Sequence, residues 1–206
     1  VKSIMSEEIE NEKEDIKVIL LGEPGTGKTC LINVAIEEKF IESTESTAGS
    51  TFVSKTFTRD DQDYIVDIWD TAGQEKYRAL TKIFIKGSKI VIFVYAIDNK
   101  KSFDELKKYW INMTKDILGE ETIYGIVGNK TDLYLNEEVK ESEASEYAES
   151  LGMKFKTVSA KSEPGGFVQY LNELFDDYLE KNPDKTRSKS LLIDKNNLKK
   201  QKKNCC

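Results

Sequence analysis

The chain has 206 residues, a formal net charge of −6 and no histidine. Its length is sufficient for one domain with a real core, and 38% apolar with 33% charged residues is typical of a globular protein. The lack of histidine excludes a Ser-His-Asp triad, a histidine zinc site and general-base catalysis by histidine. The three cysteines form no disulfide framework, which favours the cytosol.

Charge is unevenly distributed along the chain. Residues 183–206 carry eight Lys or Arg against two Asp, a balance of +6, so residues 1–182 carry −12. A basic segment after an acidic body favours contact of that segment alone with an anionic surface, and the alternative is a solubilising disordered terminus.

Five stretches have the composition of strands. Three contain apolar runs of the kind found in buried parallel strands, one is the last strand of the chain, and one alternates around the turn signal RDDQD, so it predicts two strands. The longest apolar run, residues 90–97, is too short to span a bilayer. The stretches are residues 16–22, 50–70, 89–98, 122–130 and 154–160.

Segments whose apolar residues recur at helical spacing lie between these strands. We expect Ser102 to cap the second helix, Gly152 to end the third and Pro183 to follow the last. The expected helices are residues 28–40, 103–117, 142–152 and 165–181. Alternating strands and helices predict a three-layer α/β fold with a mostly parallel, six-stranded sheet. Ligands of such folds bind at the carboxyl ends of the strands.

The first motif, GEPGTGKT at residues 22–29, satisfies G-x-x-x-x-G-K-[ST] between a strand and a helix. Its backbone N–H groups can surround a phosphate chain, Lys28 adds a positive charge near the β- and γ-phosphates, and Thr29 offers a hydroxyl to Mg²⁺. The remaining residues expected to contact the nucleotide here are Glu23, Pro24, Gly25, Thr26, Gly27 and Cys30.

The second motif, DIWDTAGQE at residues 67–75, ends a predicted strand with Asp70, which is well placed for the Mg²⁺ shell. Gly73 offers an N–H that can approach the γ-phosphate. Gln74 can orient an attacking water without needing a pKa near neutrality.

Two further motifs concern the base. In GNKTD, the Asp132 carboxylate can accept two hydrogen bonds from the guanine N1 and N2 donors, a pattern that adenine does not offer. Asn129 can bond the base edge and pack the loop, and the Lys130 stem can cover the ring. In TVSAK, which contains Ser159, the Ala160 N–H can meet guanine O6 and Lys161 can brace the loop.

These motifs, in this order, resemble those of Ras-superfamily small GTPases over residues 15–181. The resemblance implies a P-loop GTPase fold, GTP and GDP as ligands with Mg²⁺, and slow GTP hydrolysis. It makes Thr47 the switch threonine that binds Mg²⁺ and the γ-phosphate, and Phe40 the aromatic residue packed against guanine. The implied catalytic residues are Gln74, Lys28 and Thr47, and the implied metal ligands are Thr29, Thr47 and Asp70.

Within the superfamily, IWDTAGQEKYRALTKIFIKGS resembles the second switch of Rab proteins. Phe52, Trp69 and Phe84 match the aromatic trio that Rab effectors contact. A Rab implies a monomeric switch in vesicle transport on the cytoplasmic face of a membrane, cycling with the cytosol. It further implies an exchange factor, a GTPase-activating protein, a GDP-dissociation inhibitor and an escort protein, with no role for nucleic acid.

The segment KKQKKNCC, residues 199–206, fits this branch. Adjacent cysteines do not readily bond each other, and no histidine completes a metal site. The resemblance implies prenylation of Cys205 and Cys206. We expect residues 1–14 to be a flexible acidic extension and residues 182–206 a disordered basic tail.

Three positions depart from the usual Rab pattern. Ala48 lacks the aliphatic side chain that partners contact, Thr44 replaces a tyrosine that often covers the nucleotide, and Pro24 occupies a P-loop position that is commonly small. One alternative is therefore a slowly hydrolysing guanine-nucleotide-binding scaffold. A metabolic P-loop kinase or ATPase is disfavoured by NKTD and by the lack of a substrate lid.

Overall fold

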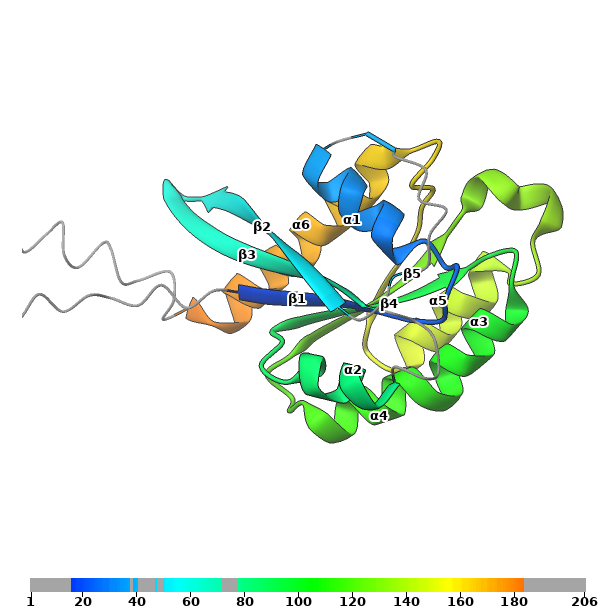
Figure 1. The fold of residues 1–206 in the computed structure, drawn as a ribbon, viewed down its shortest axis with the longest axis horizontal. Coiled ribbons are helices and arrows are strands. Elements are labelled where there is room, and N and C mark those ends of the chain that lie inside the picture. The colour runs from blue at the N-terminus through cyan, green and yellow to red at the C-terminus, as the bar shows by residue number, and fades with distance from the viewer. Residues whose placement is uncertain (1–15, 38, 41–46, 48–49, 72–77, 184–206) are drawn as a thin grey trace, which may run out of the picture.

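The computed structural model describes residues 16–37, 39–40, 47, 50–71 and 78–183. Its centre is a six-stranded sheet in the order β2-β3-β1-β4-β5-β6, which confirms the predicted α/β fold (Figure 1). The antiparallel pair of the sheet is β2–β3, and the other neighbours are parallel. The strands are β1 (Ile16–Leu21), β2 (Ser50–Arg59), β3 (Gln62–Thr71), β4 (Ile90–Ala96), β5 (Ile123–Asn129) and β6 (Lys154–Thr157).

Helices cover both faces of the sheet (Figure 1). They are α1 (Lys28–Glu37), α2 (Arg78–Ile85), α3 (Lys100–Glu105), α4 (Ile111–Ile117), α5 (Glu141–Ser150) and α6 (Pro164–Lys181). A π-helical turn η2 (Leu106–Trp110) joins α3 to α4, and a 3₁₀ helix η3 (Thr131–Asn136) follows β5. None of the described helices is long and apolar enough to cross a bilayer.

The core has two parts because each central strand is apolar on both faces. In β1, Val18 and Leu20 pack beneath α1 and α6, whereas Ile19 and Leu21 face the side of α3, η2, α4 and α5. All residues of β4 are buried. Such burial on both faces stabilises the parallel strands.

The second helix of the sequence prediction begins earlier than expected. Asn99, in extended conformation, is its N-cap and accepts a hydrogen bond from the Ser102 N–H at 3.0 Å. The prediction that Ser102 is the cap is therefore wrong. The Ser102 hydroxyl instead donates to the Asn99 carbonyl at 2.6 Å and accepts from the Ala96 N–H at 3.1 Å, which fastens the helix to the end of β4.

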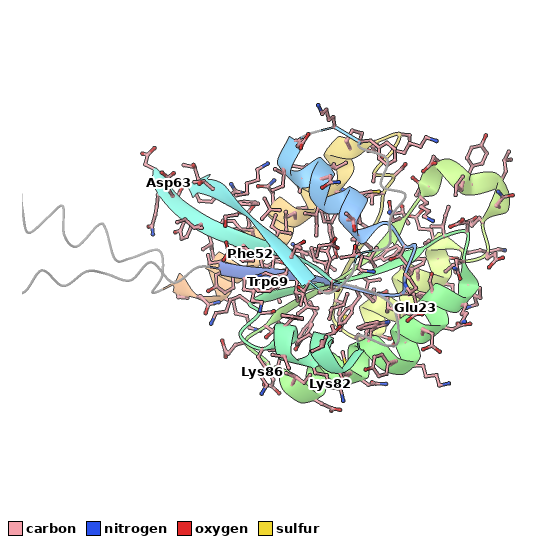
Figure 2. The ribbon with its side chains drawn as sticks, viewed as in Figure 1. Glu23, Phe52, Asp63, Trp69, Lys82 and Lys86 are labelled. Atoms are coloured by element: carbon pink, nitrogen blue, oxygen red, sulfur yellow. The ribbon has the colours of Figure 1, made fainter. Side chains whose placement is uncertain are left out.

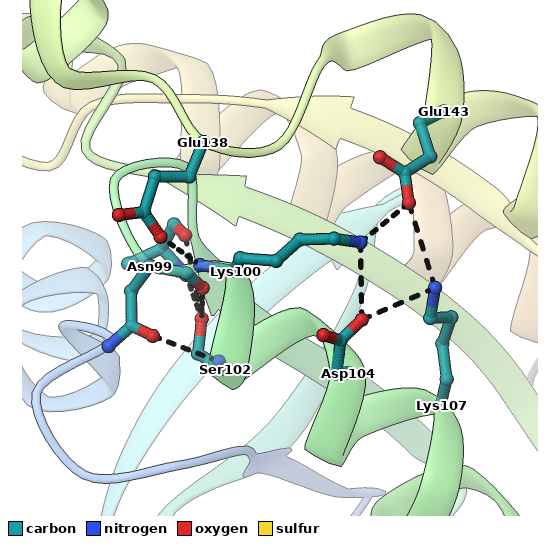
Figure 3. Close-up of polar contacts among 8 residues, drawn as sticks. Asn99, Lys100, Ser102, Asp104, Lys107, Glu138 and Glu143 are labelled. Carbon is teal, nitrogen blue, oxygen red and sulfur yellow. Dashed lines mark hydrogen bonds and ion pairs between the residues drawn. The ribbon is translucent and has the colours of Figure 1, made fainter.

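The same helix is fastened to the segment that follows β5. The Lys100 N–H donates to Glu138 at 2.7 Å, and the Lys100 ammonium contacts Glu143 at 2.7 Å and Asp104 at 3.1 Å (Figure 3). The Lys107 ammonium lies 3.5 Å from Asp104 and 3.6 Å from Glu143. These contacts connect α3 and η2 to α5 and so hold the loop between β5 and α5 in place.

Candidate functional site

The phosphate-binding loop lies between β1 and α1, at the carboxyl end of the central strands. Gly22 has φ +150°, and a Cβ there would lie 2.1 Å from the carbonyl oxygen of Val94. Gly27 has φ +89°, and its Cβ would lie 2.3 Å from Asn129 Nδ2. Both positions therefore require glycine, because β4 and the base loop approach the backbone too closely for a side chain.

Lys28 is the buried cation of this loop, with 5% of its surface exposed. Its ammonium donates to the carbonyl oxygens of Gly22 and Glu23, each at 3.0 Å. Burial lowers the pKa of the Lys28 ammonium to about 8, and the carboxylates of Asp70 and Glu23 act in the opposite direction. A buried ammonium with few compensating anions is suited to bind a phosphate oxygen.

Three oxygen-bearing side chains meet beside the loop. Thr29 Oγ1 donates to Asp70 Oδ2 at 2.7 Å, Thr47 Oγ1 donates to the same oxygen at 3.2 Å, and the two hydroxyls lie 3.0 Å apart. Asp70 is 6% exposed, and its Oδ1 is buried without a hydrogen-bond partner among the described residues.

This group fits a magnesium ion. Mg²⁺ takes oxygen ligands, usually one or two protein groups together with phosphates and waters. Two hydroxyls and one carboxylate with a free buried oxygen match that preference. The described residues contain no cluster of three or more His, Cys, Asp or Glu, so a site built from many carboxylates or from thiolates is not found there.

Asn129 joins the phosphate loop to the base loops. Its Nδ2 donates to the Thr26 carbonyl at 2.8 Å, and its Oδ1 accepts from the Ala160 N–H at 3.2 Å. The side chain is 1% exposed. Asn129 therefore packs the loops, one of the two roles that the sequence predicts for it. The Ala160 N–H, expected to meet guanine O6, donates to Asn129 in this structure.

Asp132 and Ser159 form the second connection between the base loops. The Ser159 hydroxyl donates to Asp132 Oδ1 at 2.6 Å and accepts from the Lys161 and Ser162 N–H groups at 3.2 and 3.0 Å. Lys130, between Asn129 and Asp132, has a left-handed backbone with φ +69°. The sharp turn at Lys130 brings Asp132 back toward the TVSAK loop.

The other predicted residues are placed as follows. Pro24 and Gly25 form an exposed turn, and the Thr26 hydroxyl donates to the Glu23 carbonyl at 3.0 Å. Cys30 and Phe40 are partly buried against the core on the α1 side. Gly73, Gln74, Thr44, Ala48, Cys205 and Cys206 lie outside the described residues, as do residues 1–14 and 184–206.

One contact to the phosphate loop has no counterpart in the sequence motifs. Trp110 Nε1 donates to Glu23 Oε1 at 3.0 Å, and Trp110 is fully buried. The tryptophan comes from the π-helical turn η2. The sequence shows only an apolar residue in an amphipathic helix and an acid at a variable motif position, so no local signal joins them.

The aromatic trio predicted as an effector surface gathers on one face of the sheet. Phe52 stacks on Trp69 with ring centroids 4.9 Å apart, and Trp69 lies 5.8 Å from Phe84. These side chains come from β2, β3 and α2 (Figure 2 labels Phe52 and Trp69). The Phe52–Trp69 pair follows from the antiparallel register, in which the two residues are opposite each other.

Comparisons with known proteins agree with this architecture. A family model described as the Ras family matches residues 17–181. The chain is 38% identical over 152 residues to the Ras-related protein Rab5A of Oryza sativa subsp. japonica, covering 74% of each chain. It is 41% identical over 167 residues to the Ras-related protein Rab-21 of Geodia cydonium, covering 81% of this chain and 72% of the relative. It is 34% identical over 173 residues to the Ras-related protein Rab-5A of Dictyostelium discoideum, covering 84% of this chain and 83% of the relative.

Proposed function

Because the chain belongs to the Ras family, in its Rab branch, we propose which of its residues bind and hydrolyse GTP. The protein is a small GTPase that binds GTP and GDP with Mg²⁺, hydrolyses GTP to GDP and phosphate, and acts in vesicle trafficking. The observation that carries the proposal is the meeting of Thr29, Thr47 and Asp70 beside the buried Lys28 ammonium.

The residues of the phosphate loop bind and orient the triphosphate. Lys28 neutralises the β- and γ-phosphate oxygens, and the backbone N–H groups of residues 25–30 surround the phosphate chain. Thr29 and Thr47 would hold Mg²⁺, with Asp70 in its shell, and the ion would supply positive charge beside the phosphates.

Hydrolysis and switching depend on two segments, one that contains Thr47 and one that contains Gly73 and Gln74. Gln74 orients the attacking water, and the Gly73 N–H and Thr47 contact the γ-phosphate. Loss of the γ-phosphate removes those contacts, so the two segments change conformation with the nucleotide. The trio of Phe52, Trp69 and Phe84 presents the nucleotide-dependent surface to effectors.

Guanine selection belongs to the base loops. Asp132 accepts hydrogen bonds from the guanine N1 and N2 donors, while Phe40 and the Lys130 stem pack against the ring. Asn129 and Ser159 act by holding these loops and the phosphate loop at a fixed distance from each other.

The tail and the partners complete the proposed cycle. Cys205 and Cys206 carry geranylgeranyl groups, and the neighbouring lysines contact the anionic cytoplasmic leaflet. An escort protein, a GDP-dissociation inhibitor, an exchange factor and an activating protein serve a monomer that cycles between membrane and cytosol.

The metal group can be tested through nucleotide release. We expect Thr29→Ala to abolish the slowing of GDP release by Mg²⁺, because the hydroxyl that holds the ion is lost. Thr56→Ala, an exposed threonine on β2, is the matched control and should behave as wild type. The measurement is the release rate of a fluorescent GDP with Mg²⁺ or EDTA. An unchanged Mg²⁺ response in Thr29→Ala contradicts the assignment.

A further inference from the structure

A groove lies at the end of the sheet opposite the phosphate loop, and we call it the basal groove. It lies between the end of α4, the amino ends of β5 and β6, and the last turns of α6. Figure 1 shows that α6 runs to the end of the sheet where β1 begins, away from the phosphate loop. The volume of the groove is about 620 Å³, which is within the range of ligand pockets. The apolar residues of its floor are Leu118, Ile123, Tyr124, Leu151 and Met153.

The floor of the basal groove is an edge of the hydrophobic core. Four of its residues are partly buried and pack against the two core clusters, and the fifth, Met153, belongs to one of them and is 7% exposed. Gly119 also lines the groove, and a Cβ at this position would meet no atom within 4 Å. Its φ lies outside the left-handed region, so neither strain nor close packing requires glycine there. The described residues therefore leave room beside the floor for apolar side chains from elsewhere.

Charged side chains of both signs border the basal groove. Lys154 and Asp177 form an ion pair with each other at 2.7 Å. The ammonium of Lys181 donates to the backbone carbonyl of Glu120. Within the part of the chain that the structure describes, Lys115, Glu120 and Lys181 have no ion pair within 4.0 Å. The rim of the groove thus offers two cations and one carboxylate to an occupant.

The chain after α6 contains one segment that suits this groove. Residues 184–206 are mostly polar, but Leu191, Leu192 and Ile193 form a run of three apolar residues. Lys189 stands two residues before the run, and Asp194 follows it directly. An apolar run with a cation before it and an anion after it matches a groove with an apolar floor and a rim of both signs.

This segment is near enough in the sequence to reach the groove. Lys181 borders the groove, and Leu191 follows it by ten residues. Ten residues of extended chain can span roughly 30 Å. A short linker holds a segment near its site at an effective concentration of about 1 mM. A contact of millimolar strength is therefore enough to fill the groove in a large share of molecules.

We infer that residues 191–193 bind in the basal groove of their own chain, with Asp194 beside Lys181 and Lys189 beside Glu120. Burial of the apolar run stabilises the contact, and the covalent linkage favours this segment over the same segment of a second copy. The inference goes beyond the proposed function, because the groove is remote from the phosphate loop. On a tail that carries the proposed lipids, the contact would leave residues 194–204 as the tether between the body and the membrane.

The test is photo-crosslinking of the unlipidated full chain in its GDP form, with benzoylphenylalanine in place of Leu192. This side chain inserts on illumination into C–H bonds that it touches, and mass spectrometry identifies the crosslinked residues. The matched control carries the same side chain in place of Leu198, an apolar residue of the tail outside the run. Thermal unfolding and GDP affinity verify that each protein is folded.

We expect the label at position 192 to crosslink within one chain to residues 115–124 or 151–154, with a yield that does not depend on protein concentration. Leu191→Ser/Ile193→Ser in the labelled chain should lower this yield about fivefold, because the apolar contacts are lost. Asn196→Ser/Asn197→Ser is the matched control and should leave the yield unchanged. Equal yields from labels at 192 and 198, or crosslinks to other surfaces, overturn the inference. Crosslinks between chains that increase with concentration make a second copy the occupant and overturn it as well.

A charge exchange tests the placement of Asp194. We expect Lys181→Glu to lower the crosslinking yield by about twofold to threefold, since exposed ion pairs are weak, and Lys181→Glu/Asp194→Lys to restore it. Lys108→Glu, at an exposed lysine of η2, is the control and should have no effect. A yield that the exchange does not restore contradicts the pairing of Asp194 with Lys181. None of these readouts depends on GTP hydrolysis or on lipids, so failure of the proposed function would leave them unchanged.

Discussion

Asp132 accepts a hydrogen bond from Ser159 through one carboxylate oxygen, which fixes the side chain that we assign to guanine. In Asp132→Asn an amide donor replaces an acceptor, so we expect GTP affinity to fall by about a hundredfold and xanthosine triphosphate affinity to rise. Competition binding with GTP, xanthosine triphosphate and ATP measures both effects. Equal affinity of wild type for ATP and GTP contradicts the base assignment.

Pro24 is exposed at the turn of the phosphate loop. Its ring fixes φ near −65° and folds back on its own backbone. We therefore expect intact nucleotide binding and an intrinsic rate within about tenfold of the usual 10⁻⁴ s⁻¹. Gln74→Leu should be slower, because it removes the amide that orients water.

Single-turnover hydrolysis by wild type, Pro24→Gly and Gln74→Leu tests whether Pro24 obstructs hydrolysis or leaves it at the usual rate. If wild type is as slow as Gln74→Leu while Pro24→Gly is much faster, the proline obstructs catalysis. The slowly hydrolysing scaffold, the alternative raised by the sequence, then becomes the better description.

At the scale of elements, the π-helical turn η2 connects a helix to the phosphate loop. Trp110 donates to Glu23, and the Glu23 carbonyl accepts from both Lys28 and Thr26. π-helical turns often occur at functional sites, where the extra residue redirects a side chain. We therefore expect Trp110 to act as a positioning residue, which holds Glu23 in the phosphate loop.

We expect Trp110→Phe to speed GDP release by about fivefold to tenfold, since one hydrogen bond to a charged group is lost. Glu23→Gln retains an acceptor oxygen and should release GDP at nearly the wild-type rate. The control is the double variant Trp110→Phe/Glu23→Ala, compared with Glu23→Ala alone. If Trp110→Phe speeds GDP release equally in the Glu23→Ala background, Trp110 acts by packing, and its proposed action through the hydrogen bond to Glu23 is refuted.

The sequence predicts elements well where local pattern and burial agree. The strand-like stretches, including the alternating one around RDDQD, predicted all six strands, and the P-loop motif required a turn between β1 and α1. Two elements have no such signal. In α2 the apolar Leu80 and Ile83 are exposed, and η3 is a short 3₁₀ helix that includes the exposed Tyr134 and Leu135.

In the candidate site, the residues within motifs could be predicted from the sequence, whereas the contacts between motifs could not. Lys28, Asp70, Asn129 and Asp132 come from motifs that bring phosphate, metal and base chemistry to neighbouring strand ends. The contacts between motifs have no local signal. The hydrogen bond from Asn129 to Thr26 joins residues 103 positions apart, and the one from Trp110 to Glu23 joins residues 87 positions apart. Contacts of that kind depend on strand order and helix packing, which no single motif contains.

For the whole molecule, we expect the tail to decide where the protein works. One lipid gives marginal attachment, whereas two give a stable anchor at about 0.8 kcal/mol per buried CH₂. We expect Cys205→Ser/Cys206→Ser to move the protein from the membrane fraction of cells to the soluble fraction. Mutation of the tail lysines to Gln should weaken binding to anionic membranes while prenylation is retained.

Mass spectrometry for the geranylgeranyl thioethers and cell fractionation are the measurements. A double-serine protein that still fractionates with membranes shows that another part of the chain anchors it.

The two outer strands of the sheet have a further consequence for how this protein tolerates crowding. An exposed strand edge can recruit another copy and start aggregation, and charged or very short edge strands prevent this. β2 has Ser54, Lys55 and Thr56 along its middle, and β6 has four residues, two of them lysines. A protein held on a membrane by the proposed lipids would meet its own copies at high local concentration, and we expect these edges to keep neighbouring copies from merging into a continuous sheet.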